Sequence, residues 1–181
     1  TPKQVAVAWI KEVEATAMTS AFPDGELSLR NHLGDILRIL KTKYPNIKLA
    51  YLSSRTYGGY AASTIISPEP YAYQSGFGPK WVIEQQLGGD PNLNFNASSG
   101  PVVAPWLAWG PYLWADGLTP RMSDDLVWTC QDFISDGIHP TPAGEIKAAN
   151  MILDFVKTDV TAKEWFAKDP DLTPPTVSII A

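Results

Sequence analysis

Three short apolar runs along the chain predict buried β-strands. Residues 5–10 (Val-Ala-Val-Ala-Trp-Ile) are almost continuously apolar, and residues 47–53 and 106–109 are similar in character. An apolar run without polar alternation is typical of a parallel strand that is covered on both faces. The pattern therefore predicts a parallel sheet.

Apolar residues at helical spacing predict helices between these strands. In residues 24–43, leucine and isoleucine recur at every third or fourth position until Tyr44-Pro45 ends the pattern. Residues 57–103 contain clusters of Gly, Pro, Ser and Asn around one predicted helix at 78–87. We expect this stretch to be a long decorated loop.

A last helix is predicted at residues 142–157, with four apolar residues on the face expected to be buried: Ile146, Ala149, Leu153 and Val156. Strands that alternate with helices indicate the α/β class. A sheet of three strands is too small to cover a core of this composition. We therefore expect further strands upstream of Thr1.

Composition narrows the possible partners of this protein. With 181 residues and 45% hydrophobic residues, the chain can form one domain with a substantial core. A net charge of −5 argues against nucleic acid or an anionic membrane as a partner, and no apolar run is long enough to span a bilayer. Few charges together with seven Trp, seven Tyr and sixteen Pro fit a secreted protein that contacts polymers or sugars.

Both ends of the chain suggest a piece of a longer protein. The first residue is Thr1 rather than Met, and residues 171–181 combine a Pro-rich linker with an apolar run typical of an opening strand. That run resembles the entry into a bacterial Ig-like repeat. We expect one domain at 1–167, followed by a linker and the start of another domain at 168–181.

Residues 136–145 (Asp-Gly-Ile-His-Pro-Thr-Pro-Ala-Gly-Glu) contain the strongest chemical signal. A carboxylate at Asp136 can hydrogen-bond the imidazole of His139, which fixes the tautomer as the acid of a Ser-His-Asp triad does. Thr141 can cap the following helix, with a proline at its first position. The simpler alternative is a surface turn that only caps this helix.

This motif resembles the last conserved block, Asp-x-x-His-Pro, of the SGNH or GDSL-like hydrolases. Together with the runs at 51–60 and 104–116, it is similar to a bacterial branch of that superfamily over about residues 1–167. The resemblance implies a flavodoxin-like three-layer α/β/α sandwich with a parallel sheet, here without its N-terminal strands. It also implies a serine esterase with His139 as the base, Asp136 as its orienting acid, and no metal or organic cofactor.

The nucleophile block of that family is not found in this sequence, so the resemblance implies a serine upstream of Thr1. Where the family has an oxyanion-binding Asn, this chain has Lys11, which is either an oxyanion-stabilising cation or an ordinary lysine at a strand end. Ser53 and Ser54, also at a strand end, are alternative nucleophiles, although no helix follows them directly. His32 is expected to be a solvated helix residue.

Ligands of open α/β sheets gather at the carboxyl ends of the strands. Arg55, Tyr57, Trp109 and Tyr112 follow or end predicted strands and are our substrate-binding candidates, the alternative being that the aromatic residues fill the core. With one Cys and two His far apart, no metal-ligand spacing is present.

The sequence thus predicts the C-terminal part of a secreted bacterial esterase or acetylesterase. Its substrate would be an ester-substituted carbohydrate or a similar small ester. The alternative is a non-catalytic carbohydrate-binding or adhesion domain on the same scaffold. The sequence does not predict the oligomeric state.

Overall fold

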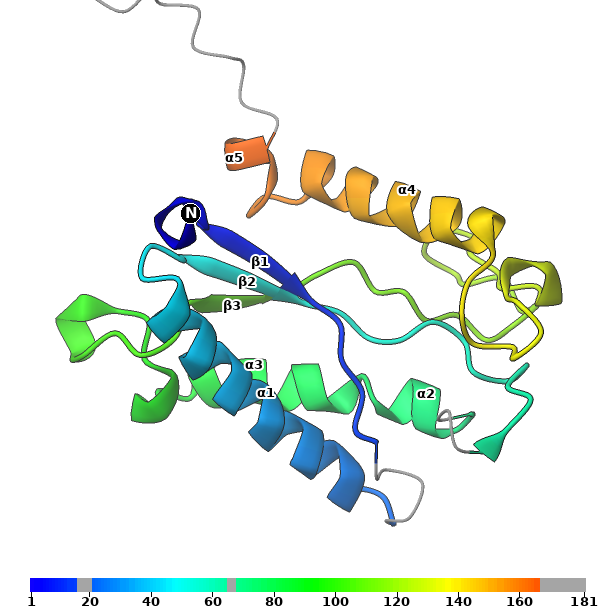
Figure 1. Ribbon diagram of the computed structural model, residues 1–181, viewed down its shortest axis with the longest axis horizontal. Coiled ribbons are helices and arrows are strands. Elements are labelled where there is room, and N and C mark those ends of the chain that lie inside the picture. The colour runs from blue at the N-terminus through cyan, green and yellow to red at the C-terminus, as the bar shows by residue number, and fades with distance from the viewer. Residues whose placement is uncertain (16–20, 65–67, 167–181) are drawn as a thin grey trace, which may run out of the picture.

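A three-stranded parallel sheet forms the centre of the molecule (Figure 1). The computed structural model describes residues 1–15, 21–64 and 68–166. Strands β1 (Val7–Ile10), β2 (Leu49–Leu52) and β3 (Trp106–Trp109) lie in that order, with β2 in the middle. All three start in register, because Val7 pairs with Leu49 and Leu49 with Trp106.

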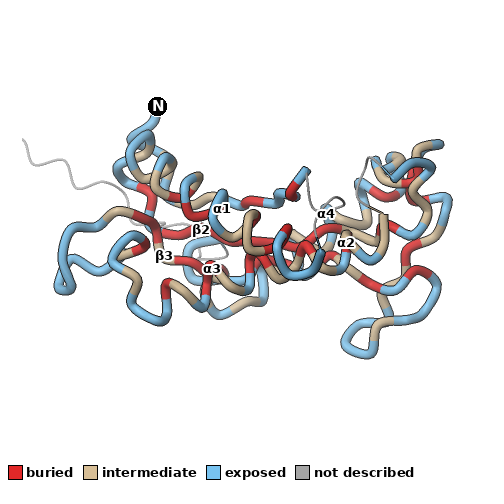
Figure 2. Tube along the Cα trace, turned by 90° about the horizontal axis from the view of Figure 1, so that it is seen from below, coloured by how far each residue is buried: buried red, intermediate tan, exposed pale blue. Residues whose placement is uncertain are grey.

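Helices cover both faces of this sheet (Figure 1). The longer helices are α1 (Asp24–Lys43), α3 (Phe77–Leu87) and α4 (Pro142–Thr158), and α2 (Tyr71–Gln74) and α5 (Lys163–Phe166) are single turns. Four 3-10 turns complete the described elements: Pro2–Gln4, Pro91–Leu93, Ala97–Ser99 and Cys130–Asp132. In Figure 2 the buried residues run through the middle of the molecule, between the helices.

The main core lies between the sheet and the pair α1 and α3. Leu33 and Leu37 of α1, Val82 of α3 and Leu52 of β2 are almost completely buried there. The side chain of Gln86 in α3 is also buried, and it accepts a hydrogen bond from the backbone N–H of Leu107. This amide therefore satisfies a backbone group on β3 that has no strand partner on its outer side among the described residues.

Helix α4 covers the opposite face, where Phe155 and Val156 pack on Leu49 and Tyr51 of β2. The face predicted for this helix is wrong in part. Val156 packs inward as expected, but Ala149 is exposed, and Ile146 and Leu153 leave 62% and 39% of their surface exposed. The inward face also carries Ala148 and Met151.

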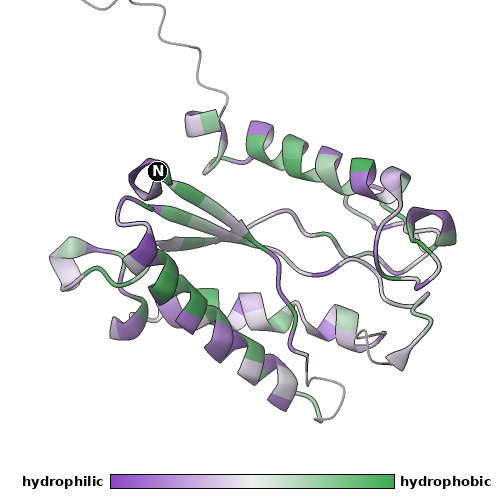
Figure 3. Cartoon of the chain, in the orientation of Figure 1, coloured by the Kyte–Doolittle hydropathy of each residue, from purple (hydrophilic) through white to green (hydrophobic). Residues whose placement is uncertain are grey.

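The three predicted strands and the three predicted helices are all present, with ends within two residues of the predictions. In Figure 3 β1 and β2 are mostly hydrophobic, whereas α1 alternates between hydrophobic and hydrophilic residues. The fold is thus α/β with a parallel sheet. No described helix is both long and apolar enough to cross a membrane. The predicted linker at 168–181 lies outside the described residues.

Candidate active site

The turn before α4 brings Asp136 and His139 into direct contact. One carboxylate oxygen of Asp136, Oδ2, lies 2.5 Å from Nδ1 of His139. The other, Oδ1, accepts hydrogen bonds of 2.9 Å from the backbone N–H groups of Ile138 and His139. Three hydrogen bonds within four residues therefore hold the carboxylate and the ring together.

Gly137 allows this turn to pack closely against a neighbouring segment. Its φ of +74° lies in the left-handed region, and a Cβ at this position would overlap the carbonyl of Tyr60. In the same turn, the carbonyl oxygen of Asp136 accepts a hydrogen bond of 2.8 Å from the backbone N–H of Ala62. The turn is thus fixed against residues 60–62 by its own backbone.

The electrostatics of the pair favour an ionised acid. The hydrogen bond from His139, followed by those from the backbone of Ile138 and His139, lowers the pKa of Asp136 to about 2. At neutral pH the carboxylate is charged, so Nδ1 donates to it and Nε2 is left as the proton acceptor. The His139 side chain is 68% exposed, and among the described residues nothing bonds to Nε2.

The start of α4 anchors the turn from its other side. Thr141 accepts a capping hydrogen bond from the N–H of Gly144, and its own N–H donates to the carbonyl of Asp132 at 2.9 Å. The buried carboxylate of Asp132 is in turn bonded to Nζ of Lys147 at 2.5 Å. Burial raises the pKa of Asp132, but the hydrogen bonds from Lys147 and Thr129 outweigh it and lower the value overall.

A cavity of about 280 Å³ opens beside His139, at the carboxyl ends of β1 and β2. Its polar lining includes His139, Lys11 and Arg55, three residues that the sequence predicted as site residues. Most of the remaining lining is apolar: Trp9, Val13, Leu113, Trp128, Phe133, Ile138, Pro140 and Ala148. The cavity therefore combines an exposed base, two cationic side chains and an apolar wall.

The two cations lie close enough to influence each other. Loss of hydration lowers the pKa of Lys11, although much of its surface is exposed, and the positive charge of Arg55 lowers it further. Burial likewise lowers the pKa of Arg55, partly offset by the negative charge of Glu69. The structure thus brings two basic side chains to this cavity, with the negative charges of Glu12 and Glu69 near enough to offset part of their positive charge.

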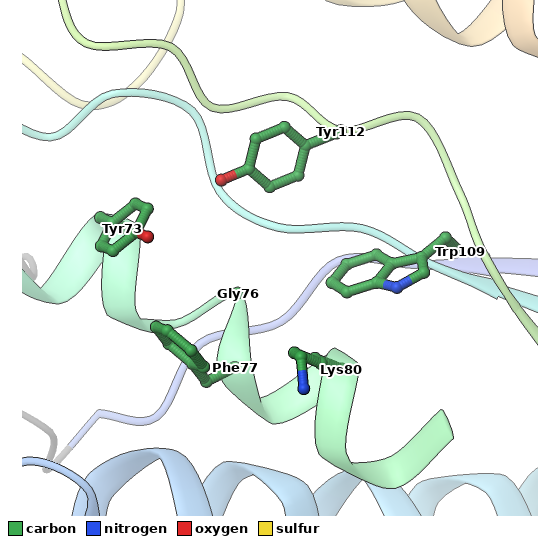
Figure 4. A pocket seen from close by; sticks show the side chains of 6 residues that line it. All are labelled: Tyr73, Gly76, Phe77, Lys80, Trp109 and Tyr112. Atoms are coloured by element: carbon green, nitrogen blue, oxygen red, sulfur yellow. The ribbon is translucent and has the colours of Figure 1, made fainter. Parts of the chain in front are cut away.

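The other predicted binding residues lie elsewhere. Trp109 and Tyr112 line a separate cavity of about 160 Å³ on the α3 side of the sheet (Figure 4). Tyr57 is half-buried and packs edge-on against Tyr60, with ring centroids 5.1 Å apart. Tyr57 lines neither of the two cavities. A position at or after the end of a strand was therefore not enough to predict that these three side chains lie beside His139.

Neither alternative nucleophile meets His139. Ser53 is fully buried, and its hydroxyl accepts a hydrogen bond of 2.9 Å from Nε1 of Trp9. Ser54 is buried on the opposite face, near Gly76, and its hydroxyl has no hydrogen-bond partner among the described residues. Neither serine lines the cavity that holds His139.

The second histidine is less isolated than the sequence suggested. The His32 ring is largely exposed, but its Nδ1 lies 2.8 Å from Oε2 of the buried Glu14. The same oxygen accepts a hydrogen bond from Ser28. Glu14 thus connects the segment after β1 to α1. The helical spacing of apolar residues did not predict this contact. No cluster of three or more His, Cys, Asp or Glu suited to a metal ion occurs in the described part of the chain.

Comparisons with known proteins add no identification. No protein-family model, no curated protein and no solved structure matches this chain. The geometry of the site and its Asp-x-x-His-Pro motif are therefore the features that point to a function.

Proposed function

We propose that this chain is the base-bearing, C-terminal part of an SGNH-type ester hydrolase. The observation that carries the proposal is the contact of 2.5 Å between Asp136 and His139 at the rim of an apolar cavity. A carboxylate bonded to Nδ1 and an exposed, acceptor Nε2 are the two properties that a general base needs in acyl transfer.

The proposed reaction uses a serine from outside the described residues. Its hydroxyl attacks the ester carbonyl while Nε2 of His139 takes the proton, and the imidazolium that forms is stabilised by Asp136. His139 then protonates the departing alkoxide. In the second half, His139 removes a proton from water, which hydrolyses the acyl-enzyme and regenerates the serine. No step needs a metal or organic cofactor.

The outer edge of β1 offers a position from which such a serine can reach the cavity. No strand pairs with this edge among the described residues, and Trp9, Lys11 and Val13, at and just after the end of β1, line the cavity. A parallel strand added here would have its carboxyl end beside the cavity, where catalytic residues of open α/β sheets gather. This placement supports a nucleophile delivered by a neighbouring strand.

The remaining lining suits the other needs of ester hydrolysis. Positive charge at Lys11 and Arg55 can stabilise the oxyanion that develops on the carbonyl, usually a large contribution to catalysis. The exposed apolar lining at Trp9 and Val13 can hold the acyl group or one face of a sugar. We therefore propose small esters or ester-substituted carbohydrates as substrates of a secreted bacterial protein.

Histidine variants of the intact natural protein that contains this chain test the proposal. We expect His139→Ala to lower kcat for p-nitrophenyl acetate by about 10³-fold or more, because the base is lost. Asp136→Asn should leave a measurable residual rate, since the base remains but its tautomer is no longer fixed. His32→Ala is the matched control, because it removes the other histidine, which also bonds a carboxylate.

Two results would contradict the proposal. One is full turnover by the His139→Ala protein when its fold, followed by circular dichroism, is intact. The other is vigorous ester hydrolysis by residues 1–181 alone, because no described hydroxyl bonds to His139.

A further inference from the structure

The cavity beside α3 has two aromatic walls (Figure 4). Trp109, at the end of β3, and Tyr112 form one wall, and their rings lie 6.4 Å apart and nearly perpendicular. Tyr73 of α2 and Phe77 of α3 form the other wall, also nearly perpendicular, at 6.0 Å. Gly76 lies between these walls, and Lys80 completes the lining.

Aromatic surface in this cavity is unusually open to solvent. Tyr73, Trp109 and Tyr112 leave 43%, 37% and 39% of their surface exposed. The series continues outward through Phe22, which is half exposed and contacts both Phe77 and Trp81. Exposed apolar surface gathered in one hollow, rather than scattered singly, marks a binding surface.

Polar groups inside the cavity define what it can bind. The hydroxyls of Tyr73 and Tyr112 point into the space between the walls (Figure 4). Burial raises the pKa of Tyr112, and the nearby hydroxyl of Tyr73 raises it further. Neither hydroxyl has a hydrogen-bond partner among the described residues. Each can therefore donate to, or accept from, a ligand.

Charge at the rim is balanced. The ammonium of Lys80 is paired with the carboxylate of Glu84 one helical turn away, and both groups are about half exposed. On the other side, the guanidinium of Arg121 lies 5.6 Å from the centre of the Tyr112 ring and is paired with Asp124. An anion or cation entering this cavity would meet both signs of charge, so a neutral ligand fits best.

The backbone leaves the floor of the cavity open. A Cβ at Gly76 would lie 3.3 Å from the carbonyl of Tyr73 and 4.0 Å from the ring of Tyr112. Any side chain there would begin to fill the gap between the two walls. The volume of about 160 Å³ is below the roughly 300 Å³ of a typical ligand site, so it accommodates one ring rather than several.

From these features we propose that the cavity is a subsite for one neutral sugar unit of a glycan. A pyranose ring has apolar C–H faces that suit the exposed aromatic rings and hydroxyls that can bond to Tyr73 and Tyr112. A purely aryl or aliphatic ligand would leave both tyrosine hydroxyls without partners. This assignment depends only on the cavity, so it holds whether or not His139 catalyses ester hydrolysis.

The subsite also bears on the substrate of the proposed hydrolase, and this step rests on that proposed function. Gly110, the residue after Trp109, lies against Trp9, which lines the His139 cavity. The two cavities thus flank the same end of the sheet, one on each face. A glycan held at Trp109 would bring a substituted sugar to His139 only if it is long enough to pass around this end of the sheet.

Binding of neutral oligosaccharides to the intact natural protein that contains this chain tests the subsite without any catalytic step, because these oligosaccharides carry no ester. We would titrate xylotetraose, cellotetraose and tetra-N-acetylchitotetraose by calorimetry, with methyl ferulate as an aryl probe and tetragalacturonate as an anionic probe. At least one neutral oligosaccharide should bind, and more tightly than either of the other probes. His139→Ala should leave this affinity unchanged.

Variants of the walls locate the bound sugar. Trp109→Ala should weaken binding by about tenfold through loss of one ring, and Tyr73→Phe and Tyr112→Phe by about three- to tenfold each through loss of a hydrogen bond. Phe95→Ala, which removes another exposed ring outside this cavity, is the matched control and should have no effect.

Any of four outcomes would overturn the assignment. Three of them are no binding of the three neutral oligosaccharides, tighter binding of methyl ferulate or tetragalacturonate, and glycan binding that survives both Trp109→Ala and Tyr112→Phe. Loss of binding in His139→Ala would place the sugar in the other cavity and would overturn it as well.

Discussion

Replacing Gly137 by alanine probes how tightly the turn of the Asp136–His139 pair is packed. The substitution imposes two costs at one position. A left-handed φ of +74° costs a non-glycine residue about 1 kcal/mol. The new Cβ overlaps the backbone carbonyl of Tyr60, which cannot rotate away as a side chain could.

Alanine substitutions at two other glycines measure these two costs separately. Gly89 has a φ of +84° and nothing within 4 Å of its missing Cβ, so Gly89→Ala carries only the backbone cost of about 1 kcal/mol. At Gly144, φ does not lie in the left-handed region, but a Cβ would overlap the carbonyl of Asp132, so Gly144→Ala carries only the steric cost of about 2 kcal/mol. For Gly137→Ala, which combines both, we expect about 3 kcal/mol.

Denaturation by urea, followed by tryptophan fluorescence, measures the free energy of unfolding for the three variants. The fully buried Trp128 packs in the cluster that supports this turn, so the signal includes the region under test. Nitrogen NMR of the two histidines adds a local measurement. Gly137→Ala should disturb the Nδ1–H tautomer of His139, and Gly89→Ala should not. Equal destabilisation by Gly137→Ala and Gly89→Ala would refute the close packing of the turn on residues 60–62.

Two further predictions concern carboxylates. The pKa of Asp136 is about 2 in the folded protein and about 4 in the unfolded chain, the ordinary value of an aspartate. Its bond to His139 therefore stabilises the fold fully above about pH 4, and this stabilisation is lost as the pH falls through about 2. The gap in unfolding free energy between the wild type and Asp136→Asn should therefore narrow between pH 5 and pH 2 on acid titration, and a constant gap would contradict the assignment. Lys147→Met should lower the free energy of unfolding by about 2 kcal/mol in urea denaturation, because buried Asp132 loses the cation that pairs with it. Arg38→Met, which removes the cation of an exposed pair, should lower it by about 0.5 kcal/mol. Equal losses in the two variants would argue against a structural role for the buried pair.

Most of the fold follows from patterns that are local in sequence. Apolar runs at 5–10, 47–53 and 106–109 identify the strands, and helical spacing identifies α1. The buried face of α4 does not follow, because this helix has apolar residues on two sides. Its orientation is set by contacts with Leu49 and Tyr51 and by the anchor at Thr141, which belong to the tertiary structure.

The candidate site was likewise predictable only in part. The contact between Asp136 and His139 follows from their spacing, whereas Trp109 and Tyr112 were expected near other strand-end residues. Side chains alternate along a strand, so Ala108 faces α4 and Trp109 faces α3. One residue therefore decides which of the two cavities a strand-end side chain reaches. The apolar wall was not predictable either, because residues as far apart in the sequence as Trp9 and Trp128 line one cavity only in the folded chain.

The short separation of Asp136 and His139 has a consequence for how such a site can evolve. The acid and the base share one turn of four residues, and the hydrogen bonds between them are made within that turn. A single insertion, deletion or recombination event can thus duplicate, transfer or remove both together. The pair lies on one short segment, so grafting residues 136–141 ahead of a helix in another protein would transfer both groups together.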